Sequence, residues 1–176
     1  MKPTQPLKFL LGLMLICLFG IAQAKTIGPN NLINKSTLGC NFSSEQSVFL
    51  SDFYSTLLKD EIVSKNISSR PYTIKDSNYV LQGFYSIGHN FIHKDKMILE
   101  YTSLDLNFKK FNMNILRIAA FSENDDGDES FGYYFVIRGA PVFISKQLTS
   151  MGIEPQNLIL EKTPAGNTRL KCILVG

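Results

Sequence analysis

Residues 113–138 read MNILRIAAFS (113–122), ENDDGDESF (123–131) and GYYFVIR (132–138), and they decide the fold of the chain. The first and third pieces have the length of strands and are rich in Ile, Val, Phe and Tyr, which favour sheets. The acidic piece between them contains Asn and Gly and has the composition of a turn. The stretch therefore predicts an antiparallel hairpin.

A short helix is predicted directly after this hairpin. Pro141 ends the second strand, because proline has no N–H to donate to a strand ladder. The apolar positions from Val142 to Met151 then recur at helical spacing, and Gly152 is placed to end the helix.

A longer helix is predicted upstream, over residues 44–64. Apolar residues recur at helical spacing from Val48 to Ile62, and Ser43 or Ser44 can cap the first turn. The residues before it, 25–38, are rich in Asn and predict an irregular lead-in with at most a short edge strand.

Further strands are predicted on both sides of the central hairpin. Residues 79–85 and 96–102 would pair through a loop at Gly88-His89-Asn90. Residues 104–108 alternate apolar with polar residues, which is typical of a strand with one solvent-exposed face. Residues 156–162 and 168–174 would form a last hairpin across Pro164–Asn167. The expected fold is α+β: an antiparallel meander of about six strands, with the long N-terminal helix and the short helix packed on one face.

The N-terminus has the pattern of an export signal. Two lysines precede an apolar run from Phe9 to Ala22, which is too short to span a bilayer, and Ala22-Gln23-Ala24 suits signal peptidase. We expect residues 1–24 to be removed, which leaves one domain at residues 25–176. That domain carries 16 Lys plus Arg against 15 Asp plus Glu, so its charge gives no reason to expect nucleic acid or a membrane as partner.

Two cysteines remain after this cleavage, Cys40 and Cys172. An even number of cysteines in an exported chain favours a disulfide between them. A reactive thiol would need a basic neighbour or a C-x-x-C spacing, and the sequence shows neither.

Two groups of residues are weak metal candidates. His89 and His93 have the spacing of ligands on one helical turn, but their neighbours predict a loop. The acidic turn, with Asp125, Asp126 and Asp128, is rich in oxygen but lacks the ligand spacing of a calcium loop. We therefore expect no metal site and no cofactor.

No catalytic motif for a serine nucleophile, a phosphate loop or a dinucleotide is present in the sequence. We expect a non-catalytic, periplasmic or secreted binding domain that engages a protein partner as an inhibitor or immunity-type protein. Aromatic residues would provide the contact surface: Phe84, Tyr85, Phe91, Tyr133 and Tyr134. One alternative is a carrier of a small apolar ligand between the sheet and the long helix, and another is a hydrolase.

The export signal makes a direct prediction. Protein recovered from outside the cytoplasm should begin at Lys25, since the small residues Ala22 and Ala24 fit the positions before a signal-peptidase cut. Intact-mass measurement and N-terminal sequencing test this, and exported protein that retains residues 1–24 would contradict it.

Overall fold

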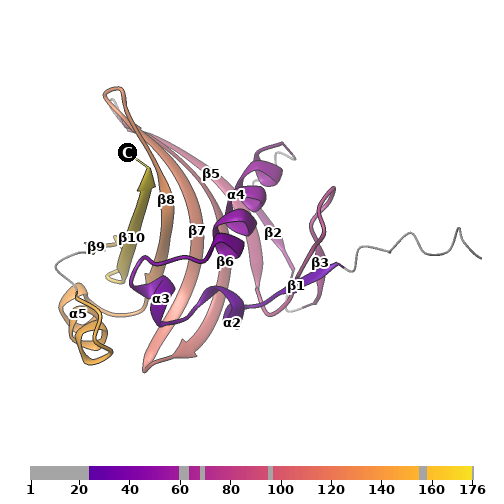
Figure 1. Ribbon diagram of the computed structural model, residues 1–176. Helices are drawn as coiled ribbons and strands as arrows, with labels where there is room; N and C mark the ends of the chain where they lie inside the picture. Colours follow the sequence, from indigo (N-terminus) through magenta and orange to yellow (C-terminus); the bar gives the residue numbers. More distant parts are fainter. Residues whose placement is uncertain (1–23, 60–63, 68–69, 95–96, 155–157, 176) are drawn as a thin grey trace, which may run out of the picture.

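The computed structural model describes residues 24–59, 64–67, 70–94, 97–154 and 158–175 (Figure 1). Within these ranges, none of the helices combines the length and the apolar character needed to cross a membrane. The predicted export signal, up to residue 23, lies outside the described residues, so its removal stays a prediction.

The structure is a mixed α+β fold built on a large antiparallel sheet, as predicted, but the sheet has seven strands in the order β2-β5-β6-β7-β8-β10-β9. Their bounds are Ser64–Asn66 (β2), Ser86–Lys94 (β5), Met97–Lys110 (β6), Met113–Asp125 (β7), Asp128–Ile137 (β8), Ile159–Lys162 (β9) and Thr168–Val175 (β10). A small second sheet joins β1 (Lys25–Ile27), β4 (Tyr79–Leu81) and β3 (Tyr72–Thr73).

The central hairpin is confirmed and is longer than predicted. β7 and β8 pair from Ile115↔Ile137 out to Asp125↔Asp128. Only two residues make the turn, Asp126 and Gly127, and both have positive φ angles of 53° and 99°. Turns of this kind match the right-handed twist of the strands they join. Most of the acidic segment is therefore paired strand.

Strand prediction was wrong on the N-terminal side of this hairpin. Gly88, His89 and Asn90 lie in the middle of β5, where they pair with Tyr101 to Ser103, and do not form a loop. The predicted strand 79–85 is shortened to β4 in the small sheet, and the two segments 96–102 and 104–108 belong to one strand, β6. The error arose because Gly and Asn usually mark turns, whereas here pairing with β6 overrides that preference.

Four helices are present in the described residues: α2 (Pro29–Leu32), α3 (Lys35–Leu38), α4 (Ser44–Lys59) and α5 (Pro141–Ser150). α4 is the predicted long helix, and Ser43 and Gln46 cap its first turn through reciprocal hydrogen bonds of 3.0 and 3.3 Å. It ends earlier than predicted, since Ser64 already belongs to β2. The lead-in that was predicted to be irregular contains α2 and α3.

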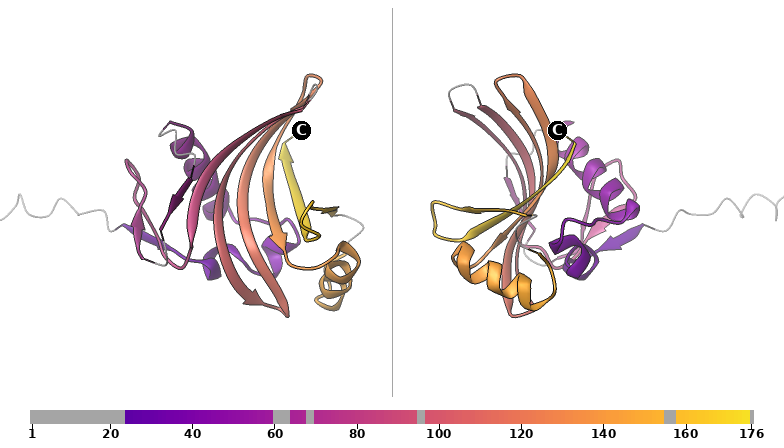
Figure 2. Two further views of the ribbon diagram at one scale, coloured as in Figure 1. Left: turned by 180° about the vertical axis from the view of Figure 1, so that it is seen from behind. Right: turned by 60° about the vertical axis from the view of Figure 1, so that its left-hand side comes forward.

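The two longer helices do not lie side by side on the sheet. α4 crosses one face of β5–β8, and the views in Figure 2 show α5 at the end of the sheet, beside β9 and β10. Ile144 and Leu148 of α5 nevertheless join the same buried core as Phe53 and Leu57 of α4. The expectation that both helices cover one face was therefore only partly correct.

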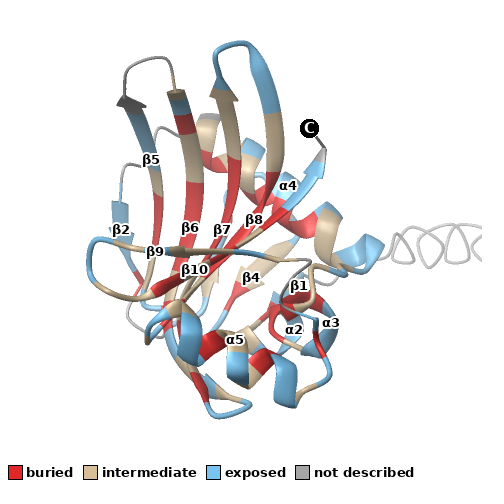
Figure 3. Cartoon of the chain, turned by 90° about the vertical axis from the view of Figure 1, so that its left-hand side faces the viewer, coloured by how far each residue is buried: buried red, intermediate tan, exposed pale blue. Residues whose placement is uncertain are grey.

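The opposite face of the sheet, here called the outer face, is also partly covered. Figure 3 shows the β9–β10 hairpin crossing in front of β5–β8 while α4 lies behind them. Beneath the hairpin a second apolar cluster is buried, made of Leu99, Ala119, Phe121 and Tyr134. Because both of its faces are covered, the centre of the sheet is apolar at consecutive positions and does not alternate.

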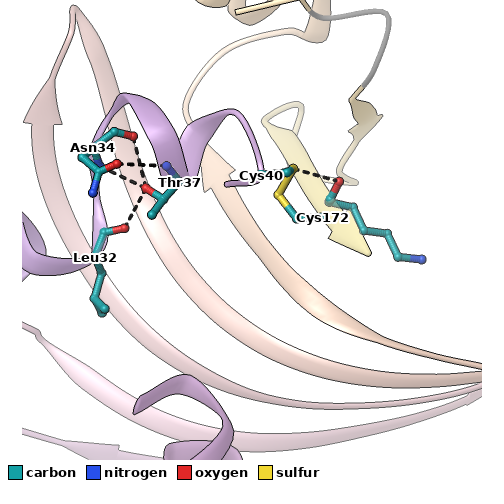
Figure 4. Close-up of a disulfide and its surroundings, with 6 residues drawn as sticks. Leu32, Asn34, Thr37, Cys40 and Cys172 are labelled. Carbon is teal, nitrogen blue, oxygen red and sulfur yellow. Dashed lines mark hydrogen bonds between the residues drawn. A yellow bond between two sulfur atoms is a disulfide. The ribbon is translucent and has the colours of Figure 1, made fainter. Parts of the chain in front are cut away.

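The predicted disulfide is confirmed: Cys40 and Cys172 are joined by an S–S bond of 2.03 Å (Figure 4). Cys40 follows α3, whose first turn is capped by the Asn34 side chain, which accepts a hydrogen bond from the Thr37 N–H at 2.9 Å. Cys172 lies in β10, opposite Tyr133 of β8. The bond therefore ties the N-terminal helices to β10 across a separation of 132 residues.

This separation sets the size of the expected effect when the bond is removed. Replacing both cysteines, Cys40→Ala with Cys172→Ala, should lower the free energy of unfolding by about 4 to 5 kcal/mol, because the unfolded chain regains the entropy of a long open loop. Urea denaturation of the oxidised protein and of the double variant measures the difference. A change below about 1 kcal/mol would show that the bond contributes little to stability.

Candidate functional site

A pocket of about 420 Å³ lies on the outer face, between the sheet and the β9–β10 hairpin. We call it the hairpin pocket. The sheet contributes Tyr101, Asp105, Leu116, Arg117, Tyr134, Val136 and Arg169, and the turn of the hairpin contributes Thr163, Pro164, Ala165 and Asn167. Its volume falls in the range of small-molecule sites, about 300 to 1,000 Å³.

Strand register explains why these side chains meet. Residues opposite each other in neighbouring antiparallel strands point to the same face. Asp105 of β6 pairs with Arg117 of β7, Arg117 with Val136 of β8, and Val136 with Arg169 of β10, so these four form one row across the outer face. Tyr134 lies in the next row of the same face, two residues from Val136.

The turn of the β9–β10 hairpin forms the remaining wall and is closed by its own hydrogen bonds. Thr163 N–H donates to the Asn167 carbonyl at 2.8 Å, and Gly166 N–H donates to the Thr163 carbonyl at 2.9 Å. Gly166 has a φ of +78°, which favours glycine. The wall is therefore a defined turn, although it is made by loop residues.

Arg117 and Asp105 form the ion pair on one side of the pocket. Arg117 Nε and Nη2 donate to the two carboxylate oxygens of Asp105 at 2.5 and 3.1 Å, and Ser86 Oγ donates to the same carboxylate at 2.8 Å. Burial lowers the pKa of Arg117, but the hydrogen bonds and the charge of Asp105 outweigh this and raise it. Each charge of the pair is thus balanced by the other.

Arg169 is held less completely on the other side. Its guanidinium lies 5.1 Å from the centre of the Tyr134 ring, a cation–π distance, and Nη1 makes a single bond of 3.3 Å to Glu161. Its Nε is buried, and no described residue accepts a hydrogen bond from it. A buried donor without an acceptor costs about 1 to 3 kcal/mol, so this guanidinium has unused hydrogen-bonding capacity.

The tyrosines complete the pocket. Tyr134 is 3% exposed, and its ring packs edge-to-face on Tyr101 at 5.7 Å between centres. Burial raises the pKa of Tyr134, and Tyr101 raises it further, whereas the charges of Arg117 and Arg169 act in the opposite direction. The Tyr134 hydroxyl therefore stays protonated at neutral pH. The pocket as a whole offers aromatic surface, the protonated hydroxyl of Tyr134 and guanidinium groups.

The structure separates the five aromatic residues predicted for partner binding. Phe84 and Tyr133 are buried in the main core, 0% and 1% exposed, and Tyr134 is buried on the outer face. These three side chains pack inside the fold and cannot be exposed anchors. Tyr85 and Phe91 are 48% and 60% exposed, and a contact between them and a partner protein stays a prediction.

The two histidines are not placed to share a metal ion. His89 and His93 lie in the extended strand β5, so their Cα atoms are separated by about 13 Å, whereas zinc ligands lie about 2 Å from the metal. Asp125, Asp126 and Asp128 lie exposed at the tip of the central hairpin. In the part of the chain that the structure describes, no three His, Cys, Asp or Glu side chains come together as a metal site.

His89 instead joins a polar chain that links α4 to the sheet. Its Nε2 lies 2.9 Å from Glu100 Oε1, and the Tyr54 hydroxyl donates to Glu100 Oε2 at 3.0 Å. Burial raises the pKa of Tyr54, and the hydrogen bond and charge of Glu100 raise it further. None of the three residues lines the hairpin pocket. We interpret these hydrogen bonds as a connection that holds α4 against the sheet.

Sequence reasoning missed Tyr101, Asp105, Arg117 and Arg169. One signal was present: Arg117 is the only charged residue between Met113 and Phe121, and a charge inside a buried strand needs a partner. Its partner and its distance from Arg169 depend on the register of four strands, which no local pattern contains.

Comparisons of the chain with protein-family models, with curated protein sequences and with solved structures find no match.

The buried tyrosine predicts a pH dependence of stability. In the unfolded chain Tyr134 loses its proton near pH 10, whereas the folded protein holds it to higher pH. The contribution of the protonated Tyr134 hydroxyl to the free energy of unfolding is therefore complete below pH 10, and it is lost as the pH rises toward the pKa of Tyr134 in the folded protein. Between these limits the free energy of unfolding of the wild type should decrease as the pH rises. In Tyr134→Phe this decrease should be smaller, by up to about 1.4 kcal/mol per pH unit.

Urea denaturation at pH 8, 10 and 11 measures this slope for both proteins. Tyr85→Phe, at an exposed position, controls for the removal of one phenol. Equal slopes for the wild type and Tyr134→Phe would contradict the burial of this hydroxyl in its neutral form.

Proposed function

We propose that this protein is a non-catalytic, exported binding domain that holds a small ligand in the hairpin pocket. The observation that carries the proposal is the composition of this pocket, in which Tyr101 and Tyr134 provide aromatic surface beside the guanidinium groups of Arg117 and Arg169. Apolar walls with a few convergent polar groups are typical of ligand sites.

The proposed ligand lies on the outer face of the sheet and not between the sheet and the long helix α4. The space between α4 and the sheet is filled by Phe49, Phe53 and Leu57, each 1% exposed, which pack with the sheet residues in one core. A ligand there would have to displace close-packed side chains, at a high cost in free energy. The outer face already has an open volume and needs no such rearrangement.

The chemistry of the pocket favours binding over catalysis. Arg117 is protonated at all ordinary pH values, and the pKa of Tyr134 is raised, so neither serves as a base. The Asp105 carboxylate already accepts three hydrogen bonds, from Arg117 and Ser86. Among the described side chains that line the pocket, no nucleophile is paired with a base.

Export is the second part of the proposal. It is supported by the disulfide between Cys40 and Cys172, since such bonds persist in oxidising compartments. The signal-like pattern of residues 1–24 supports the same compartment.

A protein partner remains a second candidate, favoured by the exposure of Tyr85 and Phe91. Native mass spectra of protein isolated from its own compartment distinguish the two. A bound small molecule predicts a mass excess of a few hundred daltons. A partner protein predicts a stoichiometric complex that is lost in the Phe91→Ala variant, because exposed aromatic residues often anchor protein interfaces.

A fluorescent probe tests the pocket directly. N-phenyl-1-naphthylamine is neutral and apolar and should bind with one-to-one stoichiometry. Ala165→Trp, at an exposed position in the pocket wall, should weaken this binding about tenfold or more, because the indole occupies the space of the probe. Fluorescence titration gives the two dissociation constants.

Ala140→Trp is the matched control, since Ala140 is also exposed and lies before α5, outside the pocket. It should bind the probe as the wild type does. Probe binding that is absent, or that Ala165→Trp leaves unchanged, would overturn the proposed site.

A further inference from the structure

The hairpin pocket has an uneven balance of charge. Three ionisable side chains of fixed charge line it: Arg117, Arg169 and Asp105. Two are cations and one is an anion, so the lining carries a net charge of +1. A neutral ligand would add no negative charge to balance it.

The excess charge is located on Arg169 and not on Arg117. Arg117 and Asp105 are joined by two hydrogen bonds of 2.5 and 3.1 Å, which is the bidentate geometry of a strong ion pair. Arg169 has one bond of 3.3 Å, to Glu161. The Glu161 side chain is 41% exposed and does not line the pocket, so water and salt weaken this pair.

Arg169 is also oriented by its neighbours. Its guanidinium lies over the ring of Tyr134 at a cation–π distance, 5.1 Å from the ring centre, which favours a position beside the pocket. Five N–H donors are available in a guanidinium, and the structure shows one of them bonded to Glu161. The free donors suit a planar or tetrahedral group of anionic oxygens.

We propose that the ligand of the hairpin pocket is a monoanion with an apolar or aromatic body, and that Arg169 binds its anionic group. The body would lie against Tyr101, Tyr134 and Val136, and a carboxylate, sulfonate or phosphate ester would accept hydrogen bonds from Arg169. This inference rests on the proposed function, because it names the class of ligand for the same pocket.

Two probes that differ by a single charged group test the inference. 8-anilinonaphthalene-1-sulfonate is N-phenyl-1-naphthylamine with one added sulfonate, so the pair separates the anionic group from the apolar body. Arg169→Gln should weaken binding of the sulfonate probe by about 10- to 100-fold, the value of hydrogen bonds to a charged group. It should weaken binding of the neutral probe much less, so the ratio of the two affinities, and not either affinity alone, tests the role of Arg169.

Lys162→Gln is the matched control. Lys162 is exposed on β9 of the same hairpin and does not line the pocket, so the variant removes the same charge nearby. It should leave the affinity for both probes unchanged. A loss of sulfonate binding equal to that of Arg169→Gln would show that only the overall charge matters, which would overturn the role of Arg169.

The remaining outcomes separate the two proposals. If Arg169→Gln changes neither probe, or weakens both equally, while Ala165→Trp blocks binding, the pocket binds ligands but Arg169 does not select anions. If Ala165→Trp affects neither probe, the pocket is not the binding site, and both proposals fail. Circular dichroism of each variant confirms that it is folded before titration.

Discussion

The pairing of β10 with β8 is the contact on which the rest of the structure depends. Gly132 makes it possible, since a Cβ atom at this position would lie 2.0 Å from the carbonyl oxygen of Cys172. The same cysteine is joined to Cys40, so β10 is held to β8 by ladder bonds and to the N-terminal helices by a covalent bond. Once β10 is fixed, the hairpin it forms with β9 crosses the outer face (Figure 3).

This crossing changes what the outer face can do. A bare sheet face is normally polar, because it meets water. Here Phe121 and Tyr134 are 0% and 3% exposed under the hairpin. Charged side chains of the outer face lie around them in two ion pairs, Lys171 with Glu123 and Arg117 with Asp105. The result is a face with an apolar centre and a charged border, which suits a ligand that is partly apolar and partly charged.

The candidate site and the core are built by side chains on opposite faces of the same strands. On β7, Ile118 and Ala120 point to α4, while Arg117 and Ala119 point to the outer face. On β8, Tyr133 and Phe135 face the core, and Tyr134 faces the pocket. Substitutions in the pocket therefore leave the core contacts of their neighbours in place, which makes the pocket variants suitable tests of binding.

The sequence alone determined the elements whose signal is local. The turn chemistry of residues 123–130 predicted the central hairpin, and the apolar spacing of α4 predicted the long helix. The two cysteines of the predicted mature domain, Cys40 and Cys172, predicted the disulfide. Each prediction depends on near neighbours or on simple pairing. Only the tertiary structure decided that Gly88-His89-Asn90 lies within a strand, that Tyr133 and Tyr134 are buried, and that Asp105, Arg117 and Arg169 meet. These features depend on strand register, where a shift of one residue moves every side chain to the other face.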